Sequence, residues 1–237
     1  MSTEPINNLG PIYSPNATCF SQLEKHIRGG HVLDIGANTG EYITGTFAGM
    51  GPTRIDAFEP VPSVYAEMEK RFVGQEEGRV FCHRLALSDT VGTTMVQVHN
   101  TWSLIPAAVA AERGVERSIE FAGQDEFEIH TTTLDVWCAE NVADPTFIKL
   151  DVDGYELRVL RGGLDTLERT RCPIYFEYSF LPELTLGDSV EEMCELIYSM
   201  GYQAWAVDLS YCAESAAEMY RWYPRHTSFD IMLIHKG

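Results

Sequence analysis

The sequence has 237 residues, 45% of them hydrophobic and 22% charged, which is enough for one sizeable core. Its 35 acidic and 17 basic residues give a formal net charge of −18, which argues against a nucleic-acid partner because phosphates would be repelled. No run reaches the ~20 apolar residues of a membrane helix, and the first residues lack the features of a signal peptide. We therefore expect a cytoplasmic protein with no membrane span and a single domain over residues 1–237.

Short apolar runs alternate with amphipathic segments along most of the chain. The pattern predicts helices after the runs at 54–58, 146–150 and 173–178. Ser63 is the expected N-cap of the first helix and Gly162 the expected end of the second, and the third is expected to start at Ser189 and end at Gly201. This alternation predicts an α/β fold, a parallel sheet covered on both faces, with one antiparallel strand at or near the edge. The expected strands are residues 31–35, 54–58, 80–86, 146–150, 173–178, 203–207 and 229–235.

Two parts of the chain depart from this alternation. Residues 1–30 form an N-terminal extension. Residues 93–135 form an insertion, in which period-2 patterns at 94–99 and 126–131 predict two strands of a hairpin-like extension. The insertion has two interpretations that the sequence leaves open, a lid that recognises the substrate or plain surface decoration.

A binding signal lies where the first two strands end. Asp34 is followed by Gly36 and Gly40, which permit a tight turn into the next helix. The turn lacks the three glycines of the dinucleotide fingerprint, which argues against a nicotinamide dehydrogenase. A carboxylate beside the turn suits a cationic ligand, for instance the ammonium group of S-adenosylmethionine. Glu59, 25 residues later, is placed to accept hydrogen bonds from ribose hydroxyls.

Several motifs resemble those of the FkbM-type S-adenosylmethionine-dependent methyltransferases, over residues 31 to 235. The resemblance implies a class I methyltransferase fold (Rossmann-like, three-layer, with a seven-stranded sheet), S-adenosylmethionine as cofactor, and methylation of a hydroxyl oxygen. The acceptor would be a small molecule or glycan, such as a sugar, polyketide or glycolipid. The motifs are D-I-G-A-N-T-G at 34–40, F-E-P at 58–60, L-A-L-S-D at 85–89, T-L-D at 133–135, and F-I-K-L-D-V-D-G-Y-E at 147–156 followed by V-L-R-G at 159–162.

The same resemblance assigns residues to the cofactor. Two positions depart from the family pattern: Asp153 stands where Glu is frequent, and Tyr155 where a small residue is usual. Both departures bear on the identity of the acceptor more than on the chemistry. The positions assigned to cofactor binding are Asp34, Gly36, Ala37, Asn38, Gly40, Glu59, Ala86, Leu87 and Ser88.

Candidate catalytic residues lie at the carboxyl ends of the fourth and fifth strands or just after them. Methyl transfer to an alcohol needs an aligned hydroxyl and a base within hydrogen-bond reach. Side chains alternate along a strand, so Lys149, Asp151 and Asp153 share one face if the extended conformation persists. Asp151 is the leading base or substrate-orienting acid, and Lys149 would keep it charged. The alternative is a purely structural ion pair.

Glu177, at the end of the fifth strand, is the third catalytic candidate. Its alternative role is a carboxylate that holds a loop NH group. His99 and His226 are alternative bases, although packing roles are the simpler interpretation of both. Asp151 and Glu177 offer oxygen ligands suited to Mg²⁺, but no third ligand is evident. Neither the cysteines nor the histidines show metal-ligand spacing, so no metal site is predicted and a divalent metal is not expected.

Two other functions remain as alternatives. An N-methyltransferase acting on nucleic acid or protein is disfavoured, because D-V-D-G at 151–154 replaces the Asn/Asp-Pro-Pro-aromatic sequence of amino-group methylases. A non-catalytic nucleotide-binding or scaffolding module would be favoured by loss of Asp34 or Glu59, and both are present.

Overall fold

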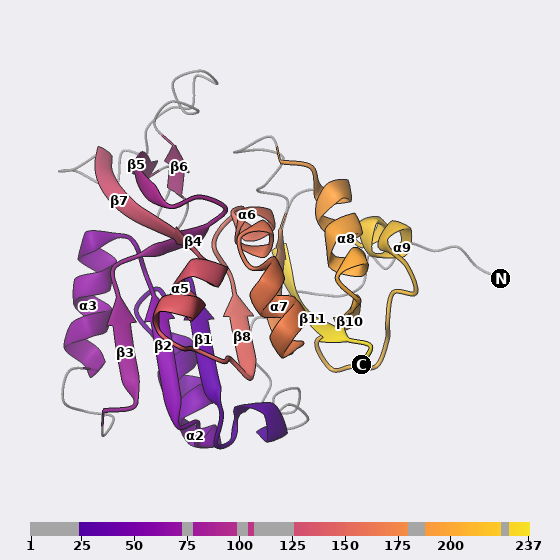
Figure 1. Cartoon of the computed structure of the whole chain (residues 1–237), viewed down its shortest axis with the longest axis horizontal. Coiled ribbons are helices and arrows are strands. Elements are labelled where there is room, and N and C mark those ends of the chain that lie inside the picture. Colours follow the sequence, from indigo (N-terminus) through magenta and orange to yellow (C-terminus); the bar gives the residue numbers. More distant parts are fainter. Residues whose placement is uncertain (1–23, 73–77, 99–103, 107–125, 180–187, 224–227) are drawn as a thin grey trace.

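The computed structural model describes residues 24–72, 78–98, 104–106, 126–179, 188–223 and 228–237. Within these ranges the chain forms two β-sheets and the helices that cover the larger one (Figure 1). No helix in the described ranges has the length and apolar character needed to span a membrane. His99 and His226, the alternative bases, lie outside the described residues.

The larger sheet has seven strands in the order β10-β11-β9-β8-β1-β2-β3. Strand β11 runs antiparallel to both of its neighbours, and every other pair is parallel. The prediction of a mostly parallel sheet with one antiparallel strand next to the edge is therefore confirmed. Its strands are β1 (His31–Ile35), β2 (Arg54–Phe58), β3 (Val80–His83), β8 (Phe147–Leu150), β9 (Ile174–Ser179), β10 (Tyr202–Ala206) and β11 (Ser228–His235).

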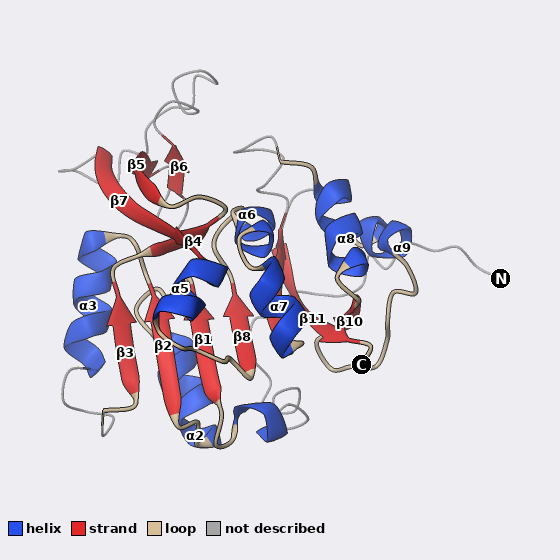
Figure 2. Cartoon of the chain, viewed as in Figure 1, coloured by secondary structure: helices blue, strands red, loops and turns tan. Residues whose placement is uncertain are grey.

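Helices cover both faces of this sheet, which makes three layers (Figure 2). One face carries α5 (Leu134–Glu140), α6 (Glu156–Arg161), α7 (Leu164–Thr170), α8 (Val190–Ser199) and α9 (Ala216–Arg221). The other face carries the π-helix η1 (Ile43–Phe47), the short α2 (Ala48–Met50) and α3 (Pro62–Phe72).

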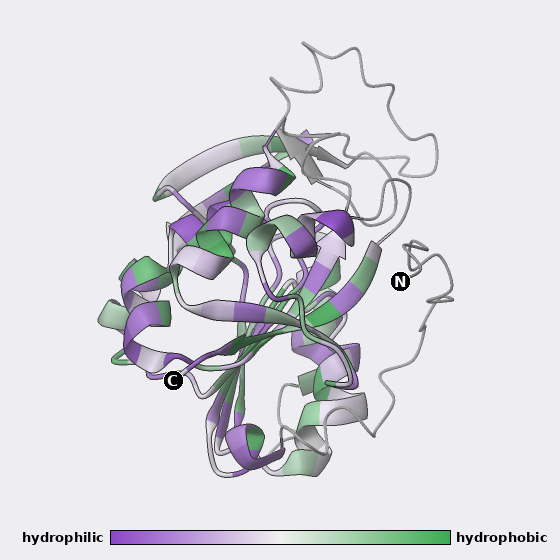
Figure 3. Ribbon diagram, turned by 90° about the vertical axis from the view of Figure 1, so that its right-hand side faces the viewer, coloured by the Kyte–Doolittle hydropathy of each residue, from purple (hydrophilic) through white to green (hydrophobic). Residues whose placement is uncertain are grey.

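The strands divide their side chains between two cores. In β1, Leu33 and Ile35 pack into the core under α5 to α9, whereas Val32 packs into the core under η1 and α3. This is the alternation expected of a strand buried on both faces. Seen from the side, hydrophobic colouring is concentrated on the central strands, between the helices (Figure 3).

One predicted helix start and one predicted helix end are confirmed, and another predicted start is wrong. Ser189 caps α8 by accepting a hydrogen bond from Glu192 N at 3.2 Å, and Gly162 is the C-cap of α6. By contrast, α3 begins at Pro62, so Ser63 lies inside the helix and is not its cap. Proline is favoured at the first helical position, where its missing NH costs nothing.

The smaller sheet contains β4 (Ala86–Ser88), β5 (Gly92–Val98), β6 (Leu104–Pro106) and β7 (Glu126–Thr133), in the order β4-β7-β5-β6. The two strands expected in the insertion pair antiparallel as β5 and β7. The single strand expected at 80–86 is wrong, because β3 stops at His83 and Ala86 already belongs to the smaller sheet. In the register, His83 pairs with Phe58, the last residue of β2, so β3 has no partner beyond it.

Candidate active site

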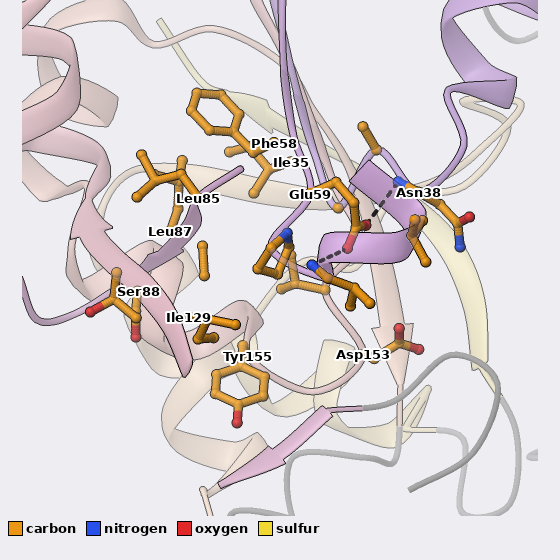
Figure 4. A pocket seen from close by; sticks show the side chains of 18 of the residues that line it. Ile35, Asn38, Phe58, Glu59, Leu85, Leu87, Ser88, Ile129, Asp153 and Tyr155 are labelled. Carbon is orange, nitrogen blue, oxygen red and sulfur yellow. Dashed lines mark hydrogen bonds between the residues drawn. The ribbon is translucent and has the colours of Figure 1, made fainter. Parts of the chain in front are cut away.

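A pocket of about 950 Å³ opens beyond the carboxyl ends of β1, β2 and β8 and extends to the smaller sheet (Figure 4). Strand β1 is flanked by β2 on one side and β8 on the other, so the strand order reverses here. Ligands of open α/β sheets bind at such a switch point. The pocket therefore lies where the fold class expects a ligand.

The turn after β1 forms one wall, and its glycines are required by the protein's own packing. Gly36 and Gly40 have φ angles of 79° and 80°, in the left-handed region. A Cβ atom on Gly36 would lie 1.7 Å from the backbone oxygen of Asp151, and one on Gly40 would lie 2.3 Å from the Phe72 ring. The turn is thus pressed against the loop after β8 and against α3. Ala37 and Asn38 line the pocket beside Gly36.

Glu59 lies in the pocket wall and is 7% exposed. Its Oε2 accepts a hydrogen bond from Asn38 N at 3.2 Å, and its Oε1 accepts one from Val61 N at 2.8 Å (Figure 4). Burial raises the pKa of Glu59 to about 7, although both hydrogen bonds oppose the shift. A carboxylate has about four acceptor positions, so each oxygen keeps one for a ligand.

Asp34 occupies a different place from the one predicted. It is fully buried and is not among the residues that line the pocket. Its neighbours Leu33 and Ile35 face the α5 to α9 core, so Asp34 faces the opposite layer, where Lys149 Nζ lies 3.4 Å from Oδ1. Burial raises the pKa of Asp34, while the charge of Lys149 lowers it. This position gives no support to a direct contact between Asp34 and the ligand.

Lys149 connects the two central loops of the site. Its Nζ donates to the Gly36 carbonyl oxygen at 2.8 Å and lies 3.1 Å from Asp151 Oδ2. It also lies 5.0 Å from the centre of the Tyr42 ring. Burial would lower the pKa of Lys149, but Asp151 and Asp34 outweigh burial and raise it. Lys149 is therefore a permanent cation that holds other groups in place.

The chain turns sharply after β8, so the extended conformation assumed for residues 149–153 does not persist. Strand β8 ends at Leu150, and Asp153 has a φ of 53°. Asp151 and Asp153 nevertheless both line the pocket. Burial, followed by the charges of Asp151 and Glu156, raises the pKa of Asp153 to about 8.

Glu177 is half-buried on β9, opposite Asp230 of β11, and is not among the pocket residues. Burial raises its pKa well above the usual range, and the nearby charge of Asp151 adds to this shift. Its location outside the wall gives no support to the predicted catalytic role. Among the described residues, no group of three or more His, Cys, Asp or Glu side chains is arranged to hold a metal ion.

Ala86, Leu87 and Ser88, which the motif resemblance assigns to the cofactor, line the pocket from β4. Ile35, Phe58, Leu85 and Leu87 form an apolar section of the wall (Figure 4). Sequence reasoning named none of the other wall residues on this side as site residues. They are residues 90–94 and the side chains Ile129, Thr131, Tyr155 and Arg158. Tyr155 carried a signal as a departure from the family pattern, and Thr93, Thr94, Ile129 and Thr131 lie in the insertion that the sequence marked as a possible recognition segment.

This sheet order, with its antiparallel strand next to the edge and its pocket at the switch point, defines the class I methyltransferase fold, which is Rossmann-like. The solved structure of methyltransferase FkbM from Methylobacillus flagellatus KT matches it with a TM-score of 0.51 and 14% identity. That match covers 87% of this chain and 44% of the other, and it supports the fold alone.

Residues 34–204 match the family model described as the methyltransferase FkbM domain. The chain therefore belongs to the FkbM methyltransferase family, whose members use S-adenosylmethionine, and the resemblance seen in the motifs is confirmed. Over 155 residues the chain is also 28% identical to the 2-O-methyltransferase NoeI of Sinorhizobium fredii. That alignment covers 62% of this chain and 63% of NoeI, so the chain spans less than two thirds of either relative.

Proposed function

We propose that this protein transfers the methyl group of S-adenosylmethionine to a hydroxyl oxygen of a small-molecule or glycan acceptor, such as a sugar or natural product. The observation that carries the proposal is the Glu59 carboxylate, held by two backbone NH groups in the wall of a pocket at the switch point. The name of NoeI, a 2-O-methyltransferase, supports oxygen as the atom that is methylated.

The residues present fit S-adenosylmethionine. Glu59 has acceptor positions left for the two ribose hydroxyls, and the apolar section around Phe58 and Leu87 suits a flat base. Asp151 places negative charge in the same wall. When bound, S-adenosylmethionine supplies a reactive methyl group on a positively charged sulfur, which this carboxylate would stabilise. In this proposal Asp34 acts indirectly, through Lys149 and the Gly36 carbonyl.

The acceptor would occupy the side of the pocket next to the smaller sheet. A volume of about 950 Å³ lies at the upper end of the range for one ligand of drug size, so two molecules can share the pocket. The wall here is largely uncharged, with Thr93, Thr94, Ile129 and Thr131 among its residues. Such a wall suits a hydroxylated acceptor. The insertion would thus recognise the acceptor, which is the first of its two interpretations.

Charge also argues for an acceptor without phosphate. Both cations of the wall are engaged: Lys149 by Gly36, Asp34 and Asp151, and Arg158 by Asp188, whose Oδ2 lies 2.9 Å from Arg158 Nε. The wall therefore offers no unpaired cation among the described residues. A phosphate group would therefore find no free positive charge among the described wall residues.

The test has two stages. Calorimetry with S-adenosylmethionine and S-adenosylhomocysteine measures binding, and absence of binding would refute the proposal. The protein is then incubated with methyl-labelled S-adenosylmethionine and a panel of glycosides, macrolides and glycolipids, with and without a chelator. Label is expected on a hydroxyl oxygen, and activity that survives the chelator would show that no divalent metal is needed. Binding without transfer to any acceptor would favour the non-catalytic alternative.

A further inference from the structure

Asp153 is held in an unusual backbone conformation by a clamp directly beside it. Asp153 and Gly154 both have positive φ angles, 53° and 106°. The NH groups of Val152 and Gly154, one on each side of Asp153, donate to the same oxygen, Glu156 Oε1, at 3.0 and 3.2 Å. Glu156 is fully buried at the start of α6. Because non-glycine residues with positive φ persist only where surrounding structure enforces them, this clamp fixes where the Asp153 side chain points.

The Asp153 carboxylate is available for chemistry, in contrast to that of Asp151. Asp151 Oδ2 lies 3.1 Å from Lys149 Nζ, which engages it in an ion pair. Asp153 is half-buried and lines the pocket, and within the described residues no hydrogen bond or ion pair engages its carboxylate (Figure 4). A group in such a position can accept a proton from a bound molecule.

The charges that face Asp153 come from four elements of the site. Burial has the largest effect on its pKa; the neighbouring carboxylates add to it, Lys149 opposes it, and the result is a pKa of about 8. A general base works best when its pKa lies near the working pH, so Asp153 is well tuned for this role. The facing groups are Lys149 on β8 and Asp151 just after it, Glu59 after β2, Glu156 on α6 and Glu177 on β9.

We propose that Asp153 is the catalytic residue that accepts the proton of the acceptor hydroxyl, and that Glu156 is the positioning residue that aims it. The inference rests on the proposed function. As the acceptor oxygen bonds to the methyl carbon, the carbon–sulfur bond breaks and its electron pair stays on the sulfur. The hydroxyl proton passes to the Asp153 carboxylate and is later released to water. This assigns to Asp153 the role that the sequence favoured for Asp151.

The first test needs neither cofactor nor acceptor. The protein is labelled with ¹³Cγ-aspartate and titrated by NMR from pH 5 to 10, as wild type, as Asp153→Asn and as Asp165→Asn, an exposed position on α7 that serves as the matched control. One carboxyl resonance is expected to titrate near pH 8 and to be missing only in Asp153→Asn. If no resonance that is lost in Asp153→Asn titrates between pH 5 and 10, the assignment is overturned.

The second test measures turnover of whichever acceptor the wild type methylates. Asp153→Asn is expected to lower kcat by about 10²- to 10⁴-fold and to abolish the rise of kcat around pH 8, with the Kd of S-adenosylmethionine within about threefold of wild type. Asp153→Glu should restore part of kcat and of the pH dependence. If Asp153→Asn keeps the wild-type kcat and pH profile, the inference fails while the proposed function stands. If the wild type methylates nothing, both fail.

Discussion

Asp34 and Lys149 are direct neighbours across β1 and β8, in the parallel register that also pairs Ile35 with Leu150. Both point to the same face of the sheet, where they form an ion pair shielded from solvent. Lys149 Nζ also donates to the carbonyl oxygen of Gly36, two residues after Asp34. The pair thus fixes the turn that carries Ala37 and Asn38 into the pocket wall.

Replacing Lys149 by Met is expected to lower the free energy of unfolding by about 3–5 kcal/mol, because removing one member of a buried ion pair leaves the other uncompensated. The Gly36 turn would also lose its tie to β8, so S-adenosylmethionine binding should weaken. Urea unfolding and calorimetry measure the two effects. The double variant Lys149→Met with Asp34→Asn should lose less stability than the two single variants added together. Strict additivity would show that the pair is not coupled.

Gly36→Ala should destabilise the protein by about 2–4 kcal/mol, the sum of a left-handed backbone penalty and overpacking against the Asp151 backbone. Gly45→Ala is the matched control, since a Cβ atom there meets nothing within 4 Å and the residue is helical. That variant should be neutral or slightly stabilising. Thermal unfolding measures the stability of both variants. Equal unfolding midpoints would contradict the close approach of Gly36 to the Asp151 backbone.

The sequence was sufficient to predict most of the larger sheet, because each strand is a compact apolar run between turn residues. It also located Glu59, since the end of a strand can be recognised from Phe58 and Pro60 alone. The place of Asp34 required the register between β1 and β8, which links residues more than a hundred positions apart. Periodicity within one strand contains no such information.

The sequence also did not predict where the chain changes direction. Residues 80–88 form a continuous, largely apolar pattern, yet β3 and β4 belong to different sheets. The break is set by the length of β2, whose last residue pairs with His83. In the same way, the alternation expected along 149–153 is wrong because Glu156, the first residue of α6, holds the backbone around Asp153 through two hydrogen bonds.

Ligand affinity should depend on pH through Glu59. The ionised carboxylate accepts hydrogen bonds from ribose hydroxyls, and the protonated form accepts fewer. Because burial raises the pKa of Glu59 to about 7, affinity should increase as the pH rises from 6 to 8. Adenosine is a suitable probe for calorimetry, since it carries the hydroxyls but no charged amino-acid group.

Glu59→Gln keeps the shape of the side chain and removes this titration. Its affinity for adenosine at pH 8 should be about 10- to 100-fold lower than that of the wild type, in line with about 1.5–3 kcal/mol for hydrogen bonds to a charged group. Its affinity should also be flat between pH 6 and 8. A Glu59→Gln protein that binds adenosine as tightly as the wild type would place the ribose elsewhere.

Asp56, the central residue of β2, should control stability at acid pH. This fully buried carboxylate accepts hydrogen bonds from three residues: His31 Nε2 at 2.6 Å, His83 Nε2 at 2.7 Å, and Arg54 Nε and Nη2 at 2.6 and 3.1 Å. Burial alone would raise its pKa, but the hydrogen bonds from these three residues outweigh burial and hold the pKa of Asp56 well below its usual range. The stabilisation is therefore complete above the ordinary carboxyl pKa of about 3.9 and is lost as the pH falls below it.

Asp56→Asn should accordingly lower the free energy of unfolding by about 3–5 kcal/mol at pH 7, because three donor residues lose a charged acceptor in a buried site. The difference in unfolding free energy between wild type and variant should narrow as the pH falls below about 3.9. There the Asp56 carboxylate takes up a proton in the unfolded wild type but not yet in the folded protein. Urea unfolding at pH 7 and pH 3 measures the gap, with Asp165→Asn as the exposed control. A gap of the same size at both pH values would mean that Asp56 stabilises the sheet by its shape and not by its charge.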